Sequence, residues 1–226
     1  MKLLVFDTET SGLPEGRETS INDTEKWPYI LQFSFILYDT LSAEILDSMN
    51  EFIYIKDYVN INEKSMEIHK ITREICKDKG IDISEALNNF YSALSKCNLV
   101  IAHNIEFDKN LVLVESIRND IENGFKTNLP IHCTMKSNIN LCKIGRINKF
   151  GEKYYKYPSL SELYQHLFKI VPNGLHNSMV DVLLCLRSFV ILNTGHDVLT
   201  RESISDLFWK YKINSGGREV KHFNIS

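Results

Sequence analysis

Hydrophobic and polar positions at the start of the chain follow a β-strand pattern. The apolar run Leu3–Phe6 stops at an acidic residue, as expected for a buried strand whose end meets solvent or a ligand. A break at Thr10–Pro14 and a polar stretch over residues 15–28 follow. Residues 29–39 are then rich in β-forming side chains, and residues 51–55 predict a third strand. The first part of the chain is therefore predicted to be a three-stranded meander.

Helical spacing of apolar residues dominates the rest of the chain. Apolar side chains recur at helical intervals within residues 83–97, and again from Phe107 to a helix stop at residues 123–124. Between these helices, residues 99–102 predict a buried strand. The later predicted elements are an edge strand at 131–134 and helices at 159–168, 178–193 and 203–212. Strands followed by alternating helices and strands predict an α/β fold with a mixed sheet flanked by helices.

The composition is typical of one folded domain. Hydrophobic residues make up 43% and aromatic residues 11% of the 226 positions, which is enough for a packed core. No apolar run approaches the roughly 20 residues that span a bilayer, and an acid follows the first strand before a signal-peptide core could form. The protein is therefore predicted to be intracellular and cytoplasmic, with no membrane partner.

The cysteines favour buried thiols over a disulfide framework or a zinc site. The five cysteines are odd in number and scattered, and they include no CxxC pair. His132 beside Cys133 does not complete a zinc-binding pattern. Thiols packed among apolar side chains are the simpler interpretation.

Asp7 and Glu9 are the first candidate functional residues. They stand two positions apart where the first strand ends, and the period of two of a strand puts both carboxylates on one face. Adjacent like charges at the edge of a core repel one another, and a hard divalent cation held by oxygen ligands compensates them directly. A solvated strand end with polar Thr8 and Thr10 is the alternative.

Asp108 is the next candidate. It lies in the first turn of the helix that follows the strand at residues 99–102, at the sheet edge where ligands of α/β proteins tend to bind. The helix macrodipole favours an anion at this position even without a ligand. The position therefore agrees with a site residue without specifying one.

His176 and Asp181 complete the candidate set. Five residues on a helix correspond to about 140° of rotation at roughly 3.6 residues per turn, so the two side chains cannot share one helical face. We therefore expect His176 in the loop before the helix, with Ser178 as N-cap and Asp181 three residues later. A capping box explains the acid without a metal, and an ordinary loop histidine explains His176.

Together, three motifs resemble those of the DnaQ-like, DEDDh exonucleases, the family that includes the proofreading subunit of bacterial DNA polymerase III. Residues 6–13 (Phe-Asp-Thr-Glu-Thr-Ser-Gly-Leu) resemble the first motif, and residues 102–108 (Ala-His-Asn-Ile-Glu-Phe-Asp) resemble the second. His176 to Asp181 matches the third, HxxxxD. Residues 68–72 also resemble the family's H-x-I-T segment.

This resemblance implies a domain and a mechanism. It covers residues 1–193 as an exonuclease domain, with residues 194–226 as its C-terminal helical extension, and it implies an RNase H-like mixed central β-sheet flanked by α-helices. It also implies two divalent cations, Mg²⁺ or Mn²⁺, bound by four carboxylates, and a histidine as general base. The implied ligands are Asp7, Glu9, Asp108 and Asp181, and the implied base is His176.

The net charge does not exclude this function. At −3 the chain lacks the basic footprint of most nucleic-acid-binding domains. Two divalent cations would neutralise the four carboxylates, which brings the net charge from −3 to +1 and places the added charge at the site itself.

The resemblance further implies residues that hold the terminal nucleotide. They are Thr8, Thr10, Leu13 and Phe107. Leu13 fits the role of a turn residue equally well, and Phe107 lies on the apolar stripe of its helix, where core packing is the simpler role.

The implied reaction is hydrolysis of phosphodiester bonds at 3′ ends of DNA, single-stranded or frayed, with release of nucleoside 5′-monophosphates. The same reaction on RNA, as in oligoribonuclease-like relatives, stays open because the five catalytic residues do not read the sugar. A catalytically silent nucleic-acid-binding module is disfavoured because no ligand is lost, and RNase H-like endonuclease activity is disfavoured by the third motif. A polymerase or another replication or repair protein is a further candidate partner.

Two basic segments lie outside the motifs. Residues 143–157 combine basic residues and tyrosines with a single acid, which suits contact with a phosphate backbone and stacking on bases, although a solvated hairpin explains the pattern equally well. The basic residues are Lys143, Arg146, Lys149, Lys153 and Lys156, the tyrosines are Tyr154, Tyr155 and Tyr157, and the acid is Glu152. In the C-terminal extension, Lys210, Lys212, Arg218 and Lys221 either dock a partner or keep the tail soluble.

Overall fold

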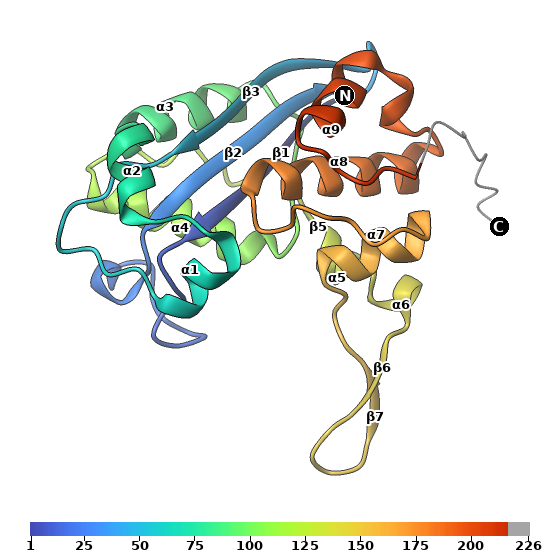
Figure 1. Cartoon of the computed structure of the whole chain (residues 1–226), viewed down its shortest axis with the longest axis horizontal. Helices are drawn as coiled ribbons and strands as arrows, with labels where there is room; N and C mark the ends of the chain where they lie inside the picture. The colour runs from blue at the N-terminus through green and yellow to red at the C-terminus, as the bar shows by residue number, and fades with distance from the viewer. Residues whose placement is uncertain (217–226) are drawn as a thin grey trace.

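The centre of the protein is a mixed five-stranded sheet. The computed structural model describes residues 1–216, and within them the strand order of this sheet is β3-β2-β1-β4-β5 (Figure 1). The strands are β1 Lys2–Thr10, β2 Ile30–Asp39, β3 Glu44–Phe52, β4 Leu99–Ala102 and β5 Ile131–Cys133. β1 pairs antiparallel with β2 and parallel with β4, so the expected mixed α/β sheet with flanking helices is confirmed.

Helices cover both faces of this sheet (Figure 1). The α-helices are α1 Glu63–His69, α2 Arg73–Lys79, α3 Ile83–Leu94, α4 Ile105–Arg118, α5 Thr134–Ser137, α6 Ile139–Cys142, α7 Leu160–Phe168, α8 Ser178–Thr194 and α9 Glu202–Lys210. Two short 3₁₀ helices are η1 Thr24–Lys26 and η2 Val198–Thr200, and a separate hairpin is formed by β6 Gly145–Ile147 and β7 Lys153–Tyr155.

The alternation of side chains along β1 divides the core between these two faces. Leu4 and Phe6 pack into one apolar cluster with residues of α3 and α4. Leu3 and Val5 pack into a second cluster with residues of α7, α8 and α9. Because successive side chains of a strand point to opposite faces, one apolar strand supports both layers of helices.

Helix α8 is the most deeply buried helix segment that positions the site. Every residue from Ser178 to Ile191 is buried, including the charged residues Asp181 and Arg187. Arg187 is only 4% exposed, and its guanidinium donates to the Asp197 carboxylate at 2.6 Å and to the Tyr164 hydroxyl. This partnering allows the charged side chain of Arg187 to be buried in a predominantly apolar helix.

The third strand differs from its prediction. β3 spans Glu44–Phe52 instead of residues 51–55, and it pairs with β2 along its whole length, from Asp39 opposite Glu44 to Gln32 opposite Phe52. The tight connection between the two strands fixes this register, and hydrophobic patterning misses it because β3 is a polar edge strand. Helix α4 also ends earlier than predicted, at Arg118, although Ile121 beyond it still packs against the core.

Helices also form in a region for which the sequence predicts none. Helices α1 and α2 were not predicted, and the structure adds them between β3 and α3. Among residues 1–216, no helix combines the length and the apolar character needed to cross a membrane. Arg218 and Lys221 lie outside the described residues.

Candidate functional site

The C-terminal half of β1 carries the first two acidic side chains of the candidate site. The strand continues through Thr10, so Asp7 and Glu9 alternate with Thr8 and share one face, as expected. Asp7 lies opposite Ser34 of β2, and the register shifts between Glu9 and Thr10. Both carboxylates are partly buried, at the end of a strand whose preceding residues form the core.

Asp108 reaches the same sheet edge from α4. The parallel pairing of β1 with β4 aligns Val5 with Ile101, so both strands end at this edge. Asn104 then turns the chain into α4 with a positive φ of 73°, a conformation that asparagine tolerates well. Asp108 is only 3% exposed, and its Oδ1 accepts hydrogen bonds from the backbone N–H of Thr8 at 3.1 Å and from the Thr8 hydroxyl at 2.8 Å.

Asp181 and His176 come from the start of α8 and the loop before it. His176 precedes the helix, as expected, with a positive φ of 66°. The predicted cap is wrong: Asn177, rather than Ser178, caps α8, and its side chain accepts from the N–H of Val180. Asp181 does not take part in a capping box, because its Oδ2 accepts from the backbone N–H of His176 at 3.1 Å.

These side chains form a compact cluster. Ligand atoms of Glu9, His176 and Asp181 all lie within 4.8 Å of one another. Asp7 and Asp108 lie outside this tight group. Their negative charges nevertheless interact with those of Glu9 and Asp181. The structure therefore brings together residues from three separate regions of the sequence.

Burial raises the pKa of every acid in the cluster, and neighbouring carboxylates add to this effect at Asp7, Glu9 and Asp181. Burial, followed by the charge of Asp181 and then Asp108, raises the pKa of Glu9 to about 8. Burial is also the main cause that raises the pKa values of Asp108 and Asp181 to about 7 each, although hydrogen bonds from Thr8 oppose it at Asp108. Burial and the three neighbouring acids raise the pKa of Asp7 well above its usual range. Such mutual repulsion favours a bound cation.

The donor set fits divalent metal ions. Within residues 1–216, Oδ1 of Asp181 is buried and has no hydrogen-bond partner, which is costly unless a ligand compensates it. Carboxylate oxygens are the ligands that hard cations such as Mg²⁺ and Mn²⁺ prefer. The unpartnered oxygen and the raised pKa values therefore both agree with a metal site at this position.

Supporting contacts around the cluster were not predicted from the sequence. The hydroxyl groups of Ser34 on β2 and Ser178 on α8 lie 2.5 Å apart and join the sheet to the start of the helix. The backbone N–H of Ser178 also donates to the side chain of Gln32 at 3.2 Å. From the 68–72 segment, His69 contacts the carbonyl of Thr10 at 3.1 Å. The only sequence signal for any of these was the H-x-I-T segment that contains His69.

The four predicted nucleotide-binding residues occupy different environments. Thr8 is 7% exposed and supports Asp108, while the hydroxyl of Thr10 donates to the carbonyl of Gly12 at 2.7 Å. Leu13 is 80% exposed on the loop after β1. Phe107 is partly buried and packs against the α3–α4 cluster, in agreement with a core role.

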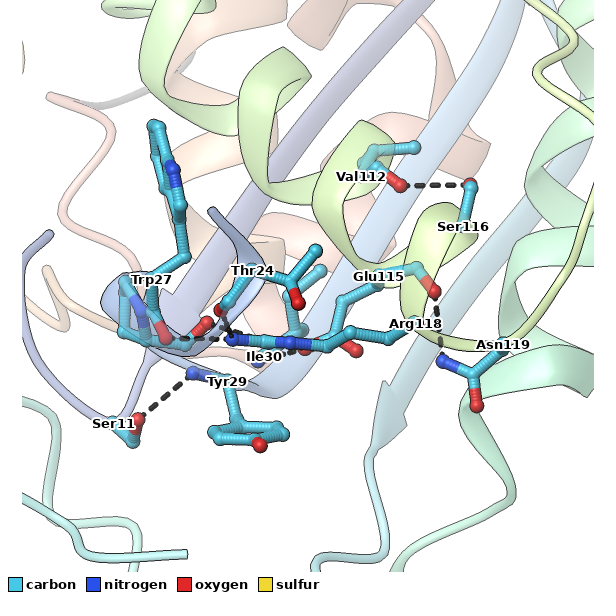
Figure 2. Close-up of polar contacts among 11 residues, drawn as sticks. Ser11, Thr24, Trp27, Tyr29, Ile30, Val112, Glu115, Ser116, Arg118 and Asn119 are labelled. Carbon is cyan, nitrogen blue, oxygen red and sulfur yellow. Dashed lines mark hydrogen bonds and ion pairs between the residues drawn. The ribbon is translucent and has the colours of Figure 1, made fainter. Parts of the chain in front are cut away.

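Arg118 at the end of α4 contacts the segment that leads into β2 (Figure 2). Its guanidinium donates to the backbone carbonyls of Thr24, Trp27 and Pro28 and pairs with Glu115 at 2.8 Å. The same group stacks on the ring of Tyr29 at 3.8 Å. The backbone N–H of Tyr29 in turn donates to the Ser11 hydroxyl at 2.9 Å, so the contacts extend to the first motif (Figure 2).

The chain matches one family model over most of its length. A family model described as an exonuclease, RNase T, matches residues 4–189. A search of curated proteins gives no match.

Solved structures of Escherichia coli exonuclease I have a similar fold. A complex with a dA16 oligonucleotide matches with a TM-score of 0.59 at 15% identity, and it covers 92% of this chain and 43% of that one. A zinc-bound complex with single-stranded DNA gives 0.60 at 16% identity, with 92% and 43% covered. A complex with a dT13 oligonucleotide carrying a 5cy group gives 0.57 at 16%, with 92% and 42% covered. The chain thus spans less than half the length of these proteins, and the expected RNase H-like fold is confirmed.

Proposed function

We propose that this chain, which belongs to the exonuclease family whose model matches residues 4–189, removes nucleotides from 3′ ends of DNA. The resemblance to DnaQ-like exonucleases that the three motifs indicated is confirmed. The observation that carries the proposal is the cluster of Glu9, His176 and Asp181 within 4.8 Å, with a buried carboxylate oxygen of Asp181 left for a ligand.

Four carboxylates are proposed to hold two divalent cations, Mg²⁺ or Mn²⁺. They are those of Asp7, Glu9, Asp108 and Asp181. When bound, the cations would supply Lewis-acid stabilisation of the charge that develops during in-line phosphodiester hydrolysis. The protein's own contribution includes holding two of these acids in place, through Thr8 at Asp108 and through the backbone N–H of His176 at Asp181.

His176 is proposed to act as the general base that accepts the proton of the attacking water. It lies on an exposed loop immediately before α8, within reach of Glu9 and Asp181, so substrate can approach its ring from solvent. The products would be nucleoside 5′-monophosphates. The DNA oligonucleotides bound to exonuclease I of E. coli support DNA as the substrate class.

The proposed catalytic domain comprises residues 1–193, and residues 194–226 are proposed as its C-terminal helical extension. Within the described part of that extension, Ile204 and Phe208 of α9 and Ile213 are buried in the same apolar cluster as α8. Shared core residues favour one folding unit over two.

Degradation of a single-stranded DNA labelled at its 5′ end, and of the matched RNA, tests the proposal. The intact protein is expected to give a ladder that shortens from the 3′ end in Mg²⁺ or Mn²⁺ and disappears in EDTA. Asp181→Asn and His176→Ala should abolish the ladder, whereas Asp206→Asn, which changes an exposed acid on α9, should not. Faster loss of the RNA would reassign the substrate, and no cleavage of either strand would leave a binding module.

A further inference from the structure

We propose that the β6–β7 hairpin is a second nucleic-acid-binding surface that holds the single strand upstream of its 3′ end; this inference rests on the proposed function. The hairpin pairs Gly145 with Tyr155 and Ile147 with Lys153, and it projects from the body of the protein beyond α5 and α6 (Figure 1). Every residue of both strands is exposed. The ribbon therefore contributes little to the core, and its side chains are available to a ligand.

The hairpin is a structured element whose turn is fixed by specific bonds. The Asn148 side chain accepts from the backbone N–H groups of Phe150 at 2.9 Å and Glu152 at 3.0 Å. The backbone N–H of Asn148 donates to the Glu152 carbonyl at 2.9 Å, and Gly151 supplies the positive φ of 84° that the turn needs. The chain thus presents the side chains of both strands in a defined register.

Positive charge on the hairpin is largely uncompensated. Lys156 pairs with Glu162 at 2.6 Å, and the only acid between the strands, Glu152, accepts a hydrogen bond from the Asn148 amide at 2.7 Å. The remaining basic residues are Lys143, Arg146, Lys149 and Lys153, which form no ion pair within residues 1–216. Cations exposed along an extended ribbon suit the evenly spaced charges of a phosphate backbone.

Exposed apolar rings accompany these cations. Phe150 is 75% exposed at the tip, while Tyr154 and Tyr155 are about half exposed on β7. The register places Arg146 opposite Tyr154, and Lys153 lies on the same face as Tyr155, so each face of the ribbon offers a cation beside a ring. Unpaired bases stack on such rings irrespective of sequence, whereas an apolar protein partner would not require the excess of cations.

The base of the hairpin is joined to the second motif. The carbonyl of Pro158 lies 3.1 Å from Nε2 of His103, which immediately precedes the turn into α4 and Asp108. From Pro158, Lys153 lies five residues along the chain, or about 16 Å at the rise of an extended strand, and Lys149 lies beyond it in the turn of the hairpin. At roughly 3.4 Å per stacked nucleotide, this distance corresponds to about five nucleotides.

Oligonucleotide binding by the full chain tests this surface separately from catalysis. Fluorescence anisotropy in EDTA, where cleavage stops, measures the affinity for oligo-dT of about four and about twelve nucleotides. The paired charge reversal Arg146→Glu/Lys153→Glu should weaken binding of the longer strand about ten-fold and leave the shorter one nearly unchanged. The slope of log affinity against log salt should fall by about 1.4, since each phosphate contact on a single strand contributes about 0.7.

Two further variants make the result specific. Lys79→Glu/Lys126→Glu makes the same charge change at exposed positions outside the hairpin and should bind like the wild type. Tyr154→Ser/Tyr155→Ser should lower affinity for the longer strand without changing the salt slope, because stacking is not electrostatic. Equal loss in the hairpin and control variants, an unchanged salt slope, or tighter binding to duplex than to single strands would overturn the proposal.

A small substrate separates failure of this inference from failure of the proposed function. The p-nitrophenyl ester of thymidine 5′-monophosphate is too short to reach the hairpin, so its metal-dependent hydrolysis reports on the site alone. Hydrolysis by both the wild type and Arg146→Glu/Lys153→Glu, with no loss of oligo-dT affinity in the latter, would retain the nuclease and reject the surface. Hairpin-dependent binding without any hydrolysis by the wild type would reject the nuclease and retain the surface.

Discussion

Replacement of Arg118 by methionine should destabilise the protein by about 3–5 kcal/mol, the range for removal of one partner from a buried ion pair. The Arg118 side chain is 10% exposed and that of Glu115 is 4% exposed. Methionine keeps much of the arginine stem but leaves the Glu115 carboxylate without its cation. It also removes the donor to the carbonyls of Trp27 and Pro28, which precede β2. Loss of the charge partner is expected to dominate because those carbonyls can bind water instead.

The pH dependence of this loss follows from Glu115. Burial raises the pKa of Glu115, and the charge of Arg118 opposes that effect. Without Arg118, the pKa of Glu115 in the folded protein rises further above its value in the unfolded chain. Protonated Glu115 then stabilises the fold at low pH, and this stabilisation is lost as pH rises through the pKa of Glu115 in the folded protein. The destabilisation by Arg118→Met should therefore be smaller near pH 5 than near pH 8.

Urea unfolding at several pH values, followed by circular dichroism, measures both effects. Arg118→Met/Glu115→Gln should regain most of the lost stability, because no buried charge then lacks a partner and the amide oxygen can still accept from Ile30. Lys96→Met removes an exposed ion pair with Asp47 and serves as the matched control, with an expected loss under about 1 kcal/mol. A loss below about 1 kcal/mol for the single variant, or one that is independent of pH, would refute the reasoning.

Three further outcomes are expected. Mg²⁺ or Mn²⁺ at about 100 times Kd should stabilise the protein by about 2.7 kcal/mol and raise Tm by roughly 5–10 °C, and Asp181→Asn should reduce this shift in a thermal scan; an equal shift in both proteins would argue against the site. Thr8→Val keeps the side-chain shape but removes the hydroxyl bond to Asp108, so it should cost about 1–2 kcal/mol in urea unfolding and lower kcat, with unchanged kcat speaking against a positioning role. Burial lowers the pKa of His103 to about 4, so the unfolded chain takes up its proton first and stability falls between about pH 6.5 and pH 4, by at most about 3 kcal/mol. His103→Gln should flatten that part of the stability profile, and an unchanged profile would assign it to other groups.

Elements with strong local patterns were predictable from the sequence. β1 and α8 were predicted because continuous apolar runs mark buried strands and helices. The positions of Asp7 and Glu9 on one face followed from the period of a strand, and the place of His176 before the helix followed from the rotation per residue. These inferences need only local geometry, which the sequence specifies directly.

Features that depend on tertiary contacts were not predictable. The edge strand β3 is aligned by its hairpin with β2, and its polar residues give no hydrophobic signal. Helices α1 and α2 are short, and their N-caps, Asn62 and Thr72, are weak signals without an apolar stripe. The predicted cap of α8 was one residue late because the Ser178 side chain instead contacts Ser34 on β2. No sequence pattern reports that contact.

The burial of α8 has a consequence for how the proposed activity would be lost. Asp181 lies in the first turn of a helix whose residues from Ser178 to Ile191 are all buried, so this proposed metal ligand cannot leave its place by a local opening of the surface. The backbone amide hydrogens in the buried part of α8 should exchange with solvent only through global unfolding, while those of the exposed β6–β7 hairpin should exchange much sooner. Heat or denaturant would therefore unfold the hairpin, and release the nucleic-acid strand proposed to bind it, before the cluster around Asp181 came apart. Loss of activity on a small substrate would coincide with unfolding of the whole domain.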